Sequence, residues 1–286
     1  MPGNRQAIQS RIRSVKSTKK ITKAMQMIAN AKLAKQRKLM ESNRFYSTEL
    51  QKLVSEIVRS DLPLNSEFLR EHTSESAYTI FFCSDLGLCG GYNANVVKFA
   101  LQELRREDPI LVVGTHAYTQ LEREGFNIVN REPISVDAMT EATLTKEIDS
   151  AIRLYLADKI GKIQICYTRF INTITFEPTI NVLLPYQEDA ADGADEEGSE
   201  KLLDIIFDPS VDEVLDALIV QMVHNVAYAN SLETKTAEQG SRRLAMETAT
   251  DNAEELEDKL TLQFNQARQA AITQELTEIV GTANAL

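Results

Sequence analysis

The feature that most constrains this chain is the absence of helix breakers from its first sixty residues. After Gly3 no glycine or proline occurs until the stop signal Ser60-Asp61-Leu62-Pro63. A narrow apolar stripe at helical spacing runs through this stretch, at Ile8, Ile12, Val15, Ile21, Met25 and Ile28 and again at Leu50, Leu53, Val54, Ile57 and Val58. Such a stripe suits a coiled-coil seam better than a globular face. A helix of about 55 residues would be about 80 Å long, which no compact domain needs.

The C-terminal end of the chain has the same character. Ser210 is a candidate N-cap after Asp208-Pro209, with Glu213 three residues later. Helical spacing follows at Val211, Val214, Leu215, Leu218, Ile219, Met222, Val223 and Val226, and later at Leu256, Leu260, Phe264, Ala267 and Ala271. Gly240 interrupts this helix at a cost of about 1 kcal/mol relative to alanine, and the sequence suggests no reason beyond local flexibility. We therefore predict two long helices, residues 1–60 and 208–286, paired as an antiparallel coiled-coil shaft.

The central region, residues 77–185, has a different pattern. Short β-branched or aromatic runs occur at residues 78–83, 110–113 and 162–167, and helical stretches occur around 94–106, 115–124 and 141–158. This alternation predicts a Rossmann-like α/β domain with a largely parallel sheet. Residues 170–184 are expected to add another strand pair, closed by Pro185. The acidic segment within residues 186–207 predicts a loop and connector. The predicted fold class is α/β plus a long antiparallel coiled coil.

Charge is distributed unevenly between the parts. Residues 1–60 carry fourteen Lys or Arg against three acidic residues, a net charge of +11, while the remainder carries −22. The basic stretch Arg11–Lys38 could bind nucleic acid, lipid headgroups or an acidic protein surface, or could be a solvated helix face. The acidic remainder disfavours nucleic acid. No apolar run approaches the roughly 20 residues of a membrane-spanning helix, and no signal peptide is expected.

Few residues are candidates for catalysis or for binding a metal or cofactor. Cys83 and Cys166 lie in apolar runs and are expected to be reduced core residues, and neither the three cysteines nor the three histidines have metal-ligand spacing. The turn Ser84–Asn93 follows a predicted strand, where a phosphate-binding loop would lie. It lacks both the Gly-Lys-Ser/Thr end of a P-loop and the dinucleotide glycine pattern. A tight turn with Asn93 capping the next helix is the preferred interpretation. We expect no catalytic, cofactor-binding or metal-binding residue.

Three motifs, which together span essentially the whole chain, resemble the gamma subunits of F-type ATP synthases. The first is Arg11-Ile12-Arg13-Ser14-Val15-Lys16-Ser17-Thr18-Lys19-Lys20-Ile21-Thr22-Lys23-Ala24-Met25, and the second is Ser84-Asp85-Leu86-Gly87-Leu88-Cys89-Gly90 with Asn93. The third is the most specific and covers residues 242–253 and 265–281. The sequence lacks the redox-active cysteine pair of chloroplast members, so thiol regulation is not expected. No transit peptide precedes the first motif, which favours a bacterial source.

The resemblance implies a non-catalytic rotor subunit of the central stalk, without a cofactor. Its paired helices would run inside the ring of alpha and beta subunits, and its α/β domain would lie near the epsilon subunit and the ring of c subunits. The subunit would transmit torque between ion flow and ATP synthesis or hydrolysis at the beta sites. It would lie at the cytoplasmic face of the bacterial cell membrane as a peripheral protein. By motif, Lys23 and Met25 match positions that face an acidic lever loop of beta, and the other ring-contact positions are Arg242, Arg268, Gln269, Thr273 and Glu275.

Two other classes of protein remain as alternatives. One is an α/β enzyme with coiled-coil arms that binds a nucleotide at Gly87–Asn93. The other is a coiled-coil protein that binds nucleic acid through residues 11–38, which predicts steeply salt-dependent DNA binding.

Overall fold

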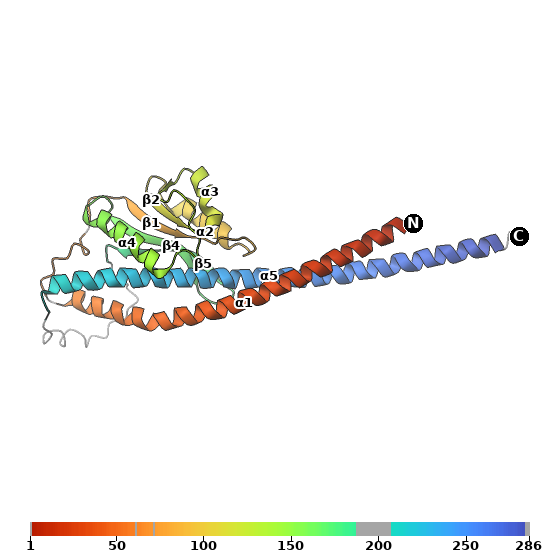
Figure 1. Cartoon of the computed structure of the whole chain (residues 1–286), viewed down its shortest axis with the longest axis horizontal. Helices are drawn as coiled ribbons and strands as arrows, with labels where there is room; N and C mark the ends of the chain where they lie inside the picture. Colours follow the sequence, from red (N-terminus) through yellow and green to blue (C-terminus); the bar gives the residue numbers. More distant parts are fainter. Residues whose placement is uncertain (1, 61, 71, 187–206, 284–286) are drawn as a thin grey trace. The chain divides into compact units, whose positions relative to one another are not determined.

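The computed structural model describes residues 2–60, 62–70, 72–186 and 207–283. The chain divides into two compact units. The tip unit comprises Met1–Ala31 with Arg242–Leu286, and the base unit comprises Lys32–Ser241. Two long helices, α1 (Pro2–Arg59) and α5 (Val211–Ala283), contribute to both units, which confirms the predicted terminal helices (Figure 1). The acidic segment predicted at residues 186–207 lies outside the described residues except for its first and last.

A five-stranded sheet with helices on both faces forms most of the base unit. The strands lie in the order β3-β2-β1-β4-β5, with parallel pairing except between β4 and β5. The strands are β1 (Ala77–Phe82), β2 (Pro109–Val113), β3 (Asn127–Ile128), β4 (Lys162–Phe170) and β5 (Phe176–Leu184), and the shorter helices are α2 (Tyr92–Glu103), α3 (Thr115–Arg123) and α4 (Glu141–Leu156). This arrangement confirms the predicted Rossmann-like domain with a largely parallel sheet.

Alternation along β1 separates the hydrophobic core into two layers. Every residue of β1 is buried, as expected for a central strand covered on both faces. Phe81 packs into a cluster with residues of α2 and α3. Ile80 and Phe82 pack into a larger cluster with α4 and with the base-unit parts of α1 and α5. The long helices of the base unit are therefore part of the sheet's own core.

The sequence-based prediction was wrong about residues 170–184. They contain one strand, β5, which pairs with a β4 that continues to Phe170. Between them, the side chain of Asn172 accepts hydrogen bonds from the backbone N–H groups of Ile174 and Thr175 at 2.9 and 2.8 Å. This turn reverses the chain between β4 and β5. The residues that we expected to form the first strand of a further pair are therefore the end of β4 and this turn.

The start of α5 agrees with the predicted capping residue. Ser210 Oγ accepts a hydrogen bond from the backbone N–H of Glu213 at 3.2 Å, which satisfies one of the free N–H groups of the first helical turn. The acidic side chains of Asp212 and Glu213 also lie in this first turn, where they interact favourably with the positive end of the helix dipole.

Gly240 is explained by a close approach between α5 and β5. A Cβ atom at this position would lie 2.7 Å from Cε1 and 2.8 Å from Cζ of Phe176. Both distances are shorter than van der Waals contact, so the aromatic ring occupies the space that any side chain would need. Glycine is less favourable than alanine within a helix, but here its missing side chain leaves the space in which the ring of Phe176 packs against α5.

We expect Gly240→Ala to lower the stability of the base unit by about 1 kcal/mol, because the overpacking cost of about 1–3 kcal/mol exceeds the gain in helix propensity. In a Phe176→Ala background the same substitution should instead stabilise by about 1 kcal/mol, since only the propensity term remains. Urea unfolding of the four chains measures the change of sign. If Gly240→Ala stabilises the protein in both backgrounds, the ring does not restrict this position.

Candidate functional site

The turn Ser84–Asn93 uses its polar groups to close on itself. Asn93 Oδ1 accepts a hydrogen bond from the backbone N–H of Ser84 at 3.1 Å, and Asn93 Nδ2 donates to Ser84 Oγ at 2.7 Å. Both side chains are buried. The prediction that Asn93 caps the next helix is wrong, because α2 begins at Tyr92 and its N-cap is Gly91. Asn93 instead ties the first turn of α2 back to the end of β1.

Asp85 connects this turn to two neighbouring segments. Its carboxylate accepts hydrogen bonds from the backbone N–H groups of Thr115 at 3.1 Å and Val136 at 3.0 Å. Thr115 is the first residue of α3, so the anion at this helix N-terminus belongs to the protein itself. A bound phosphate here would meet a negative charge in place of free N–H donors.

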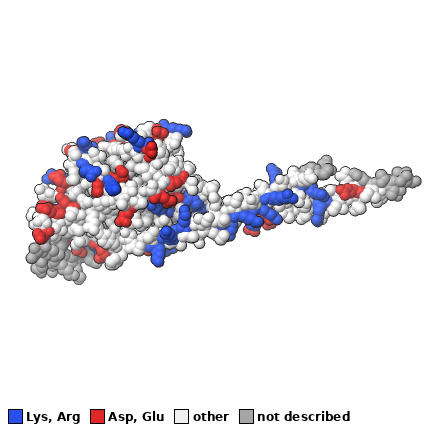
Figure 2. Space-filling model, in the orientation of Figure 1, with Lys and Arg blue, Asp and Glu red and all other residues white. Residues whose placement is uncertain are grey.

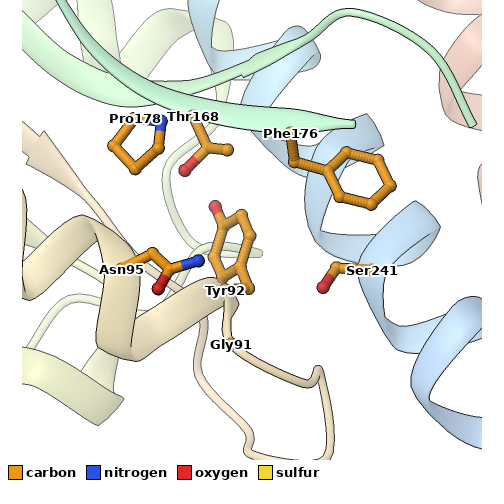
Figure 3. A pocket seen from close by; sticks show the side chains of 7 residues that line it. All are labelled: Gly91, Tyr92, Asn95, Thr168, Phe176, Pro178 and Ser241. Atoms are coloured by element: carbon orange, nitrogen blue, oxygen red, sulfur yellow. The ribbon is translucent and has the colours of Figure 1, made fainter. Parts of the chain in front are cut away.

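The pocket beside the turn is also small. It has a volume of about 60 Å³ and is lined by Gly91, Tyr92, Asn95, Thr168, Phe176, Pro178 and Ser241 (Figure 3). This volume holds only a few water molecules, whereas ligand pockets typically measure about 300–1,000 Å³. The geometry therefore favours a structural turn over a nucleotide site at Gly87–Asn93. No group of three potential metal ligands occurs within the described parts of the chain, and no described helix is long and apolar enough to span a membrane.

Cys83 and Cys166 are free and buried, as predicted. Burial raises the pKa of both thiols to about 12. The thiols therefore stay protonated near neutral pH and behave as small apolar side chains of the core.

The seam of the tip unit follows a strict heptad pattern. On α1 the partly or fully buried positions alternate at steps of four and three, and they are Ile8, Ile12, Val15, Lys19, Thr22, Gln26 and Ala29. On α5 the corresponding positions are Met246, Thr250, Ala253, Glu257, Leu260, Phe264, Ala267 and Ala271. Several of these residues are small or polar, which is unusual for a coiled-coil seam.

Contacts across the seam show that the two helices are antiparallel. Lys16 Nζ lies 3.5 Å from Glu257 Oε1, Lys19 Nζ donates to Glu254 Oε1 at 2.9 Å, and Thr250 Oγ1 donates to Thr22 Oγ1 at 2.8 Å. The hydrogen bond to Glu254 raises the pKa of Lys19. The carboxylates of α5 therefore balance part of the positive charge that the sequence places on α1.

The predicted seam was only partly correct. Ile21, Met25 and Ile28 are 56%, 37% and 59% exposed, and Lys19, Thr22, Gln26 and Ala29 take their places. Leu256 is likewise 46% exposed. These apolar side chains of α1 thus lie on the outer surface of the tip unit, and polar or small residues take their places in the seam, whereas Met246 and Leu260 of α5 remain buried in it. The 4-3 alternation that begins at Ile8, Ile12 and Val15 carries this information in the sequence.

All seven predicted contact residues lie in the tip unit, but they do not form one site. Lys23 and Met25 are exposed on α1, and Arg242 is half-buried at the start of the α5 part. Arg268, Gln269, Thr273 and Glu275 are exposed on α5. The pairing of Thr22 with Thr250 places Lys23 near residue 249, so Arg268 lies roughly 28 Å further along the helix at 1.5 Å per residue. The residues form successive levels along a rod.

The end of α5 extends beyond its partner helix. The pairing of Lys16 with Glu257 places Pro2 near residue 271, and Ala271 is the last half-buried residue in the described part of α5. Every side chain from Ile272 to Thr277 is exposed, as are Ile279 and Val280. This end of the tip unit is a single helix with apolar side chains in contact with solvent.

Basic side chains line the tip unit, as Figure 2 shows. The α1 part, residues 2–31, contains seven Lys or Arg and no acidic residue. Five of these basic residues are exposed and have no ion-pair partner among the described residues: Arg5, Arg11, Arg13, Lys20 and Lys23. The outer surface of the tip unit is therefore both apolar and cationic.

A long helical hairpin with exposed apolar and cationic side chains, together with an α/β domain, is typical of a stalk-type structural protein. A family model described as ATP synthase matches residues 4–286. The ATP synthase gamma chains of Heliobacterium modesticaldum and Symbiobacterium thermophilum are 39% and 37% identical to this chain. The alignments cover 100% of this chain in both cases, with 100% of the first relative and 99% of the second.

Solved structures share the fold. The rotor of the Euglena gracilis mitochondrial ATP synthase matches with a TM-score of 0.63 and 20% identity over 95% of this chain and 100% of the other. The central stalk of the Tetrahymena thermophila mitochondrial enzyme matches with a TM-score of 0.53 and 19% identity over 80% of this chain and 99% of the other. The chain belongs to the ATP synthase gamma-chain family. It is a non-catalytic subunit of that complex and, as a member of this family, carries no cofactor.

Proposed function

We propose that the chain is the central-stalk rotor subunit of a bacterial F-type ATP synthase and turns inside a ring of alpha and beta subunits. It would transmit torque between ion flow through the membrane sector and ATP synthesis or hydrolysis at the beta sites. The observation that carries this proposal is that large apolar side chains of α1 lie on the outside of the tip unit, while polar residues occupy part of its seam. An isolated hairpin in water would bury Ile21, Met25 and Ile28 in its seam, whereas here they face outward.

The same outer surface suggests how the ring would hold the shaft without locking it. The exposed apolar residues at the end of α5, Ile272, Leu276, Ile279 and Val280, offer non-directional contact. The exposed cations of α1 would attract an acidic surface and provide steering more than tight binding. Within this arrangement we assign Lys23 and Met25 to the acidic lever loop of beta, and Arg242, Arg268, Gln269, Thr273 and Glu275 to the surrounding ring.

The base unit supports a second set of partners. Its part of α1 exposes Leu39, Phe45, Tyr46 and Leu53, which are 40%, 74%, 45% and 39% exposed. Apolar side chains gathered on one helix of a monomer are typical of a protein interface. We assign the base unit to contacts with the epsilon subunit and the c-subunit ring, which would place the chain at the cytoplasmic face of the bacterial cell membrane as a peripheral protein.

The alternative functions receive less support. Nucleotide binding at Gly87–Asn93 conflicts with the position of Asp85 and with the size of the adjacent pocket. Nucleic-acid binding through residues 11–38 would compete with the ion pairs that Lys16 and Lys19 already form.

A pull-down of the tagged chain from gently solubilised host membranes tests the proposed function. Recovery of alpha, beta, epsilon and c subunits with ATPase activity is expected. Recovery of the chain alone, or together with nucleic acid, would contradict it.

Contacts along the shaft are expected to act collectively. Arg268→Ala and Gln269→Ala should each reduce coupling or assembly of the complex and leave the melting of the base unit unchanged, because both side chains are exposed on a single helix. Circular dichroism of the free chain and ATP-driven pumping by the complex measure the two effects. A loss of cooperative melting in either variant would contradict this separation.

A further inference from the structure

Helix α5 makes an unusual set of polar contacts with the α/β domain over one short segment of the base unit. Five elements or turns of the domain reach residues 233–241 of α5. They are the end of β4, the start of α2, the turn before α2, the loop before α4 and the start of β5. Elsewhere in the base unit α5 packs on the sheet through the apolar cluster that contains Leu215, Ile219 and Val223. It also makes a polar contact with the α/β domain through a hydrogen bond between His224 Nε2 and Asp149 Oδ1 of α4 at 2.8 Å, and nearer its start it accepts hydrogen bonds from residues 65 and 66.

Two of these contacts complete the hydrogen bonding of β4. The parallel pairing of β1 with β4 ends at Phe81 and Cys166, although β4 continues to Phe170. Beyond that point the backbone N–H of Thr168 donates to Thr234 Oγ1 at 3.2 Å, and the backbone N–H of Phe170 donates to Glu233 Oε1 at 3.0 Å. Beyond the end of β1, side chains of α5 therefore accept the hydrogen bonds that β1 accepts further back along β4. Without them these N–H groups of β4 would have no partner.

Thr234 also contacts a second element of the domain. Its Oγ1 atom forms a hydrogen bond with the hydroxyl of Tyr92, the first residue of α2, at 2.8 Å. Thr234, Tyr92 and Thr168 are 1%, 4% and 2% exposed. In Figure 3, the Tyr92 hydroxyl points toward the strand that carries Thr168. One buried hydroxyl thus joins α5 to both β4 and α2.

The remaining contacts lie along the same segment. Ser241 Oγ donates to the backbone carbonyl of Cys89 at 2.7 Å, Lys235 Nζ donates to the carbonyl of Met139 at 3.4 Å, and the ring of Phe176 covers Gly240.

We propose that Thr234 is a positioning residue that fixes the rotational setting of α5 against the α/β domain, so that torque applied to the domain enters the shaft at residues 233–241. The torque part of this statement rests on the proposed rotor function. The hydrophobic effect is non-directional, so the contribution of apolar packing to the rotational setting of the helix is spread over many side chains. Hydrogen bonds from two elements to one side-chain oxygen require a defined direction, so rotation of the helix would break both.

Thr234→Val tests the proposal, and Thr236→Val is its matched control. Thr236 is also fully buried on α5, but its hydroxyl donates only to the carbonyl of Leu232 in the same helix at 2.7 Å. In the full-length chain, Thr234→Val should raise the hydrogen-exchange rate of the Thr168 amide about tenfold, the effect of losing one net hydrogen bond of about 1.4 kcal/mol. Thr234→Ser should restore the wild-type rate, and Thr236→Val should leave it unchanged.

The second measurement is torsional. The assembled synthase is held in one nucleotide state so that the ring does not drive rotation. A bead attached to the α/β domain then reports how far the domain fluctuates in angle about the axis of the shaft. We expect a wider angular distribution for Thr234→Val than for the wild type or Thr236→Val. Tyr92→Phe removes only one of the two contacts and should widen the distribution in the same direction, which keeps the test informative if Thr234→Val fails to fold.

Two results would overturn the inference. An unchanged hydrogen-exchange rate of the Thr168 amide in Thr234→Val would show that the contact does not hold β4. Faster exchange with an unchanged angular distribution would show that torque is transmitted through other contacts between the domain and the shaft. Neither result affects the proposed rotor function. That function would instead fail if the wild-type chain, joined to its partners, showed no ATP-driven rotation of the bead.

Discussion

Asn93→Ala is expected to lower the free energy of unfolding of the base unit by about 3 kcal/mol, the largest stability effect that we predict for a single substitution. The substitution removes the acceptor of the Ser84 N–H and the donor to Ser84 Oγ, and both residues are buried. Leaving a buried donor without a partner costs about 1–3 kcal/mol, and the small void adds to it. Urea unfolding followed by circular dichroism measures the change, since the chain has no tryptophan.

Asn95→Ala is the matched control for this experiment. Asn95 is the same residue type on the same helix, two positions later, and its side chain is exposed. Its replacement should change the free energy of unfolding by no more than about 0.5 kcal/mol, as is usual for surface positions. Equal effects of the two substitutions would mean that the hydrogen bonds between Asn93 and Ser84 do not stabilise the turn.

Replacing Ile21 and Ile28 together with glutamate should leave the free chain folded and weaken its binding to the alpha–beta ring at least about a hundredfold. The two side chains are one heptad apart on the outer side of α1 and are more than half exposed. Burial of an isoleucine side chain contributes about 1.5–3 kcal/mol, so the loss of two exceeds the roughly 2.7 kcal/mol that a hundredfold change requires. Glutamate also favours helix more than isoleucine does, so melting of the free chain should not fall.

The control for this pair is the double substitution to leucine, which keeps both side chains apolar. It should bind the ring nearly as well as the wild type, because volume-conserving apolar changes are tolerated. Titration of the ring with each labelled chain compares their affinities. Wild-type affinity in the glutamate variant would show that Ile21 and Ile28 remain in solvent within the complex, and the ring would have to contact another part of the tip unit.

The sequence was sufficient to predict the elements that depend on local patterns. The lack of breakers before Ser60 and the capping residues at Ser210 define two long helices, and alternating runs of residues define the sheet. Hydrophobicity alone did not predict which side of α1 faces α5. Lys19, Thr22 and Gln26 occupy seam positions while Ile21 and Ile28 lie outside, which is the arrangement that the proposed contacts of the shaft with a surrounding ring would require.

Features that depend on distant parts of the chain could not be predicted from the sequence. Gly240 looks like a weak point of a helix until Phe176, from a strand more than sixty residues earlier, is placed against it. Asn93 has the residue type of a helix cap, but Ser84 at the end of β1 offers buried partners for its amide. The seven ring-contact residues came from family resemblance, and their contacts remain predictions.

The unequal lengths of the paired helices have a consequence for assembly. Because α1 begins opposite residue 271 or so, the last described turns of α5 lack a partner helix in the free chain. The end of a helix frays in water because its last carbonyl groups have no intrahelical partner and no packing supports it. Insertion into a closely fitting apolar sleeve would supply the missing contacts, so part of the binding energy would be used for ordering this segment. The rotor would thus complete its own folding in the act of entering the ring, and slow hydrogen exchange at residues 272–277 would report a fully seated shaft.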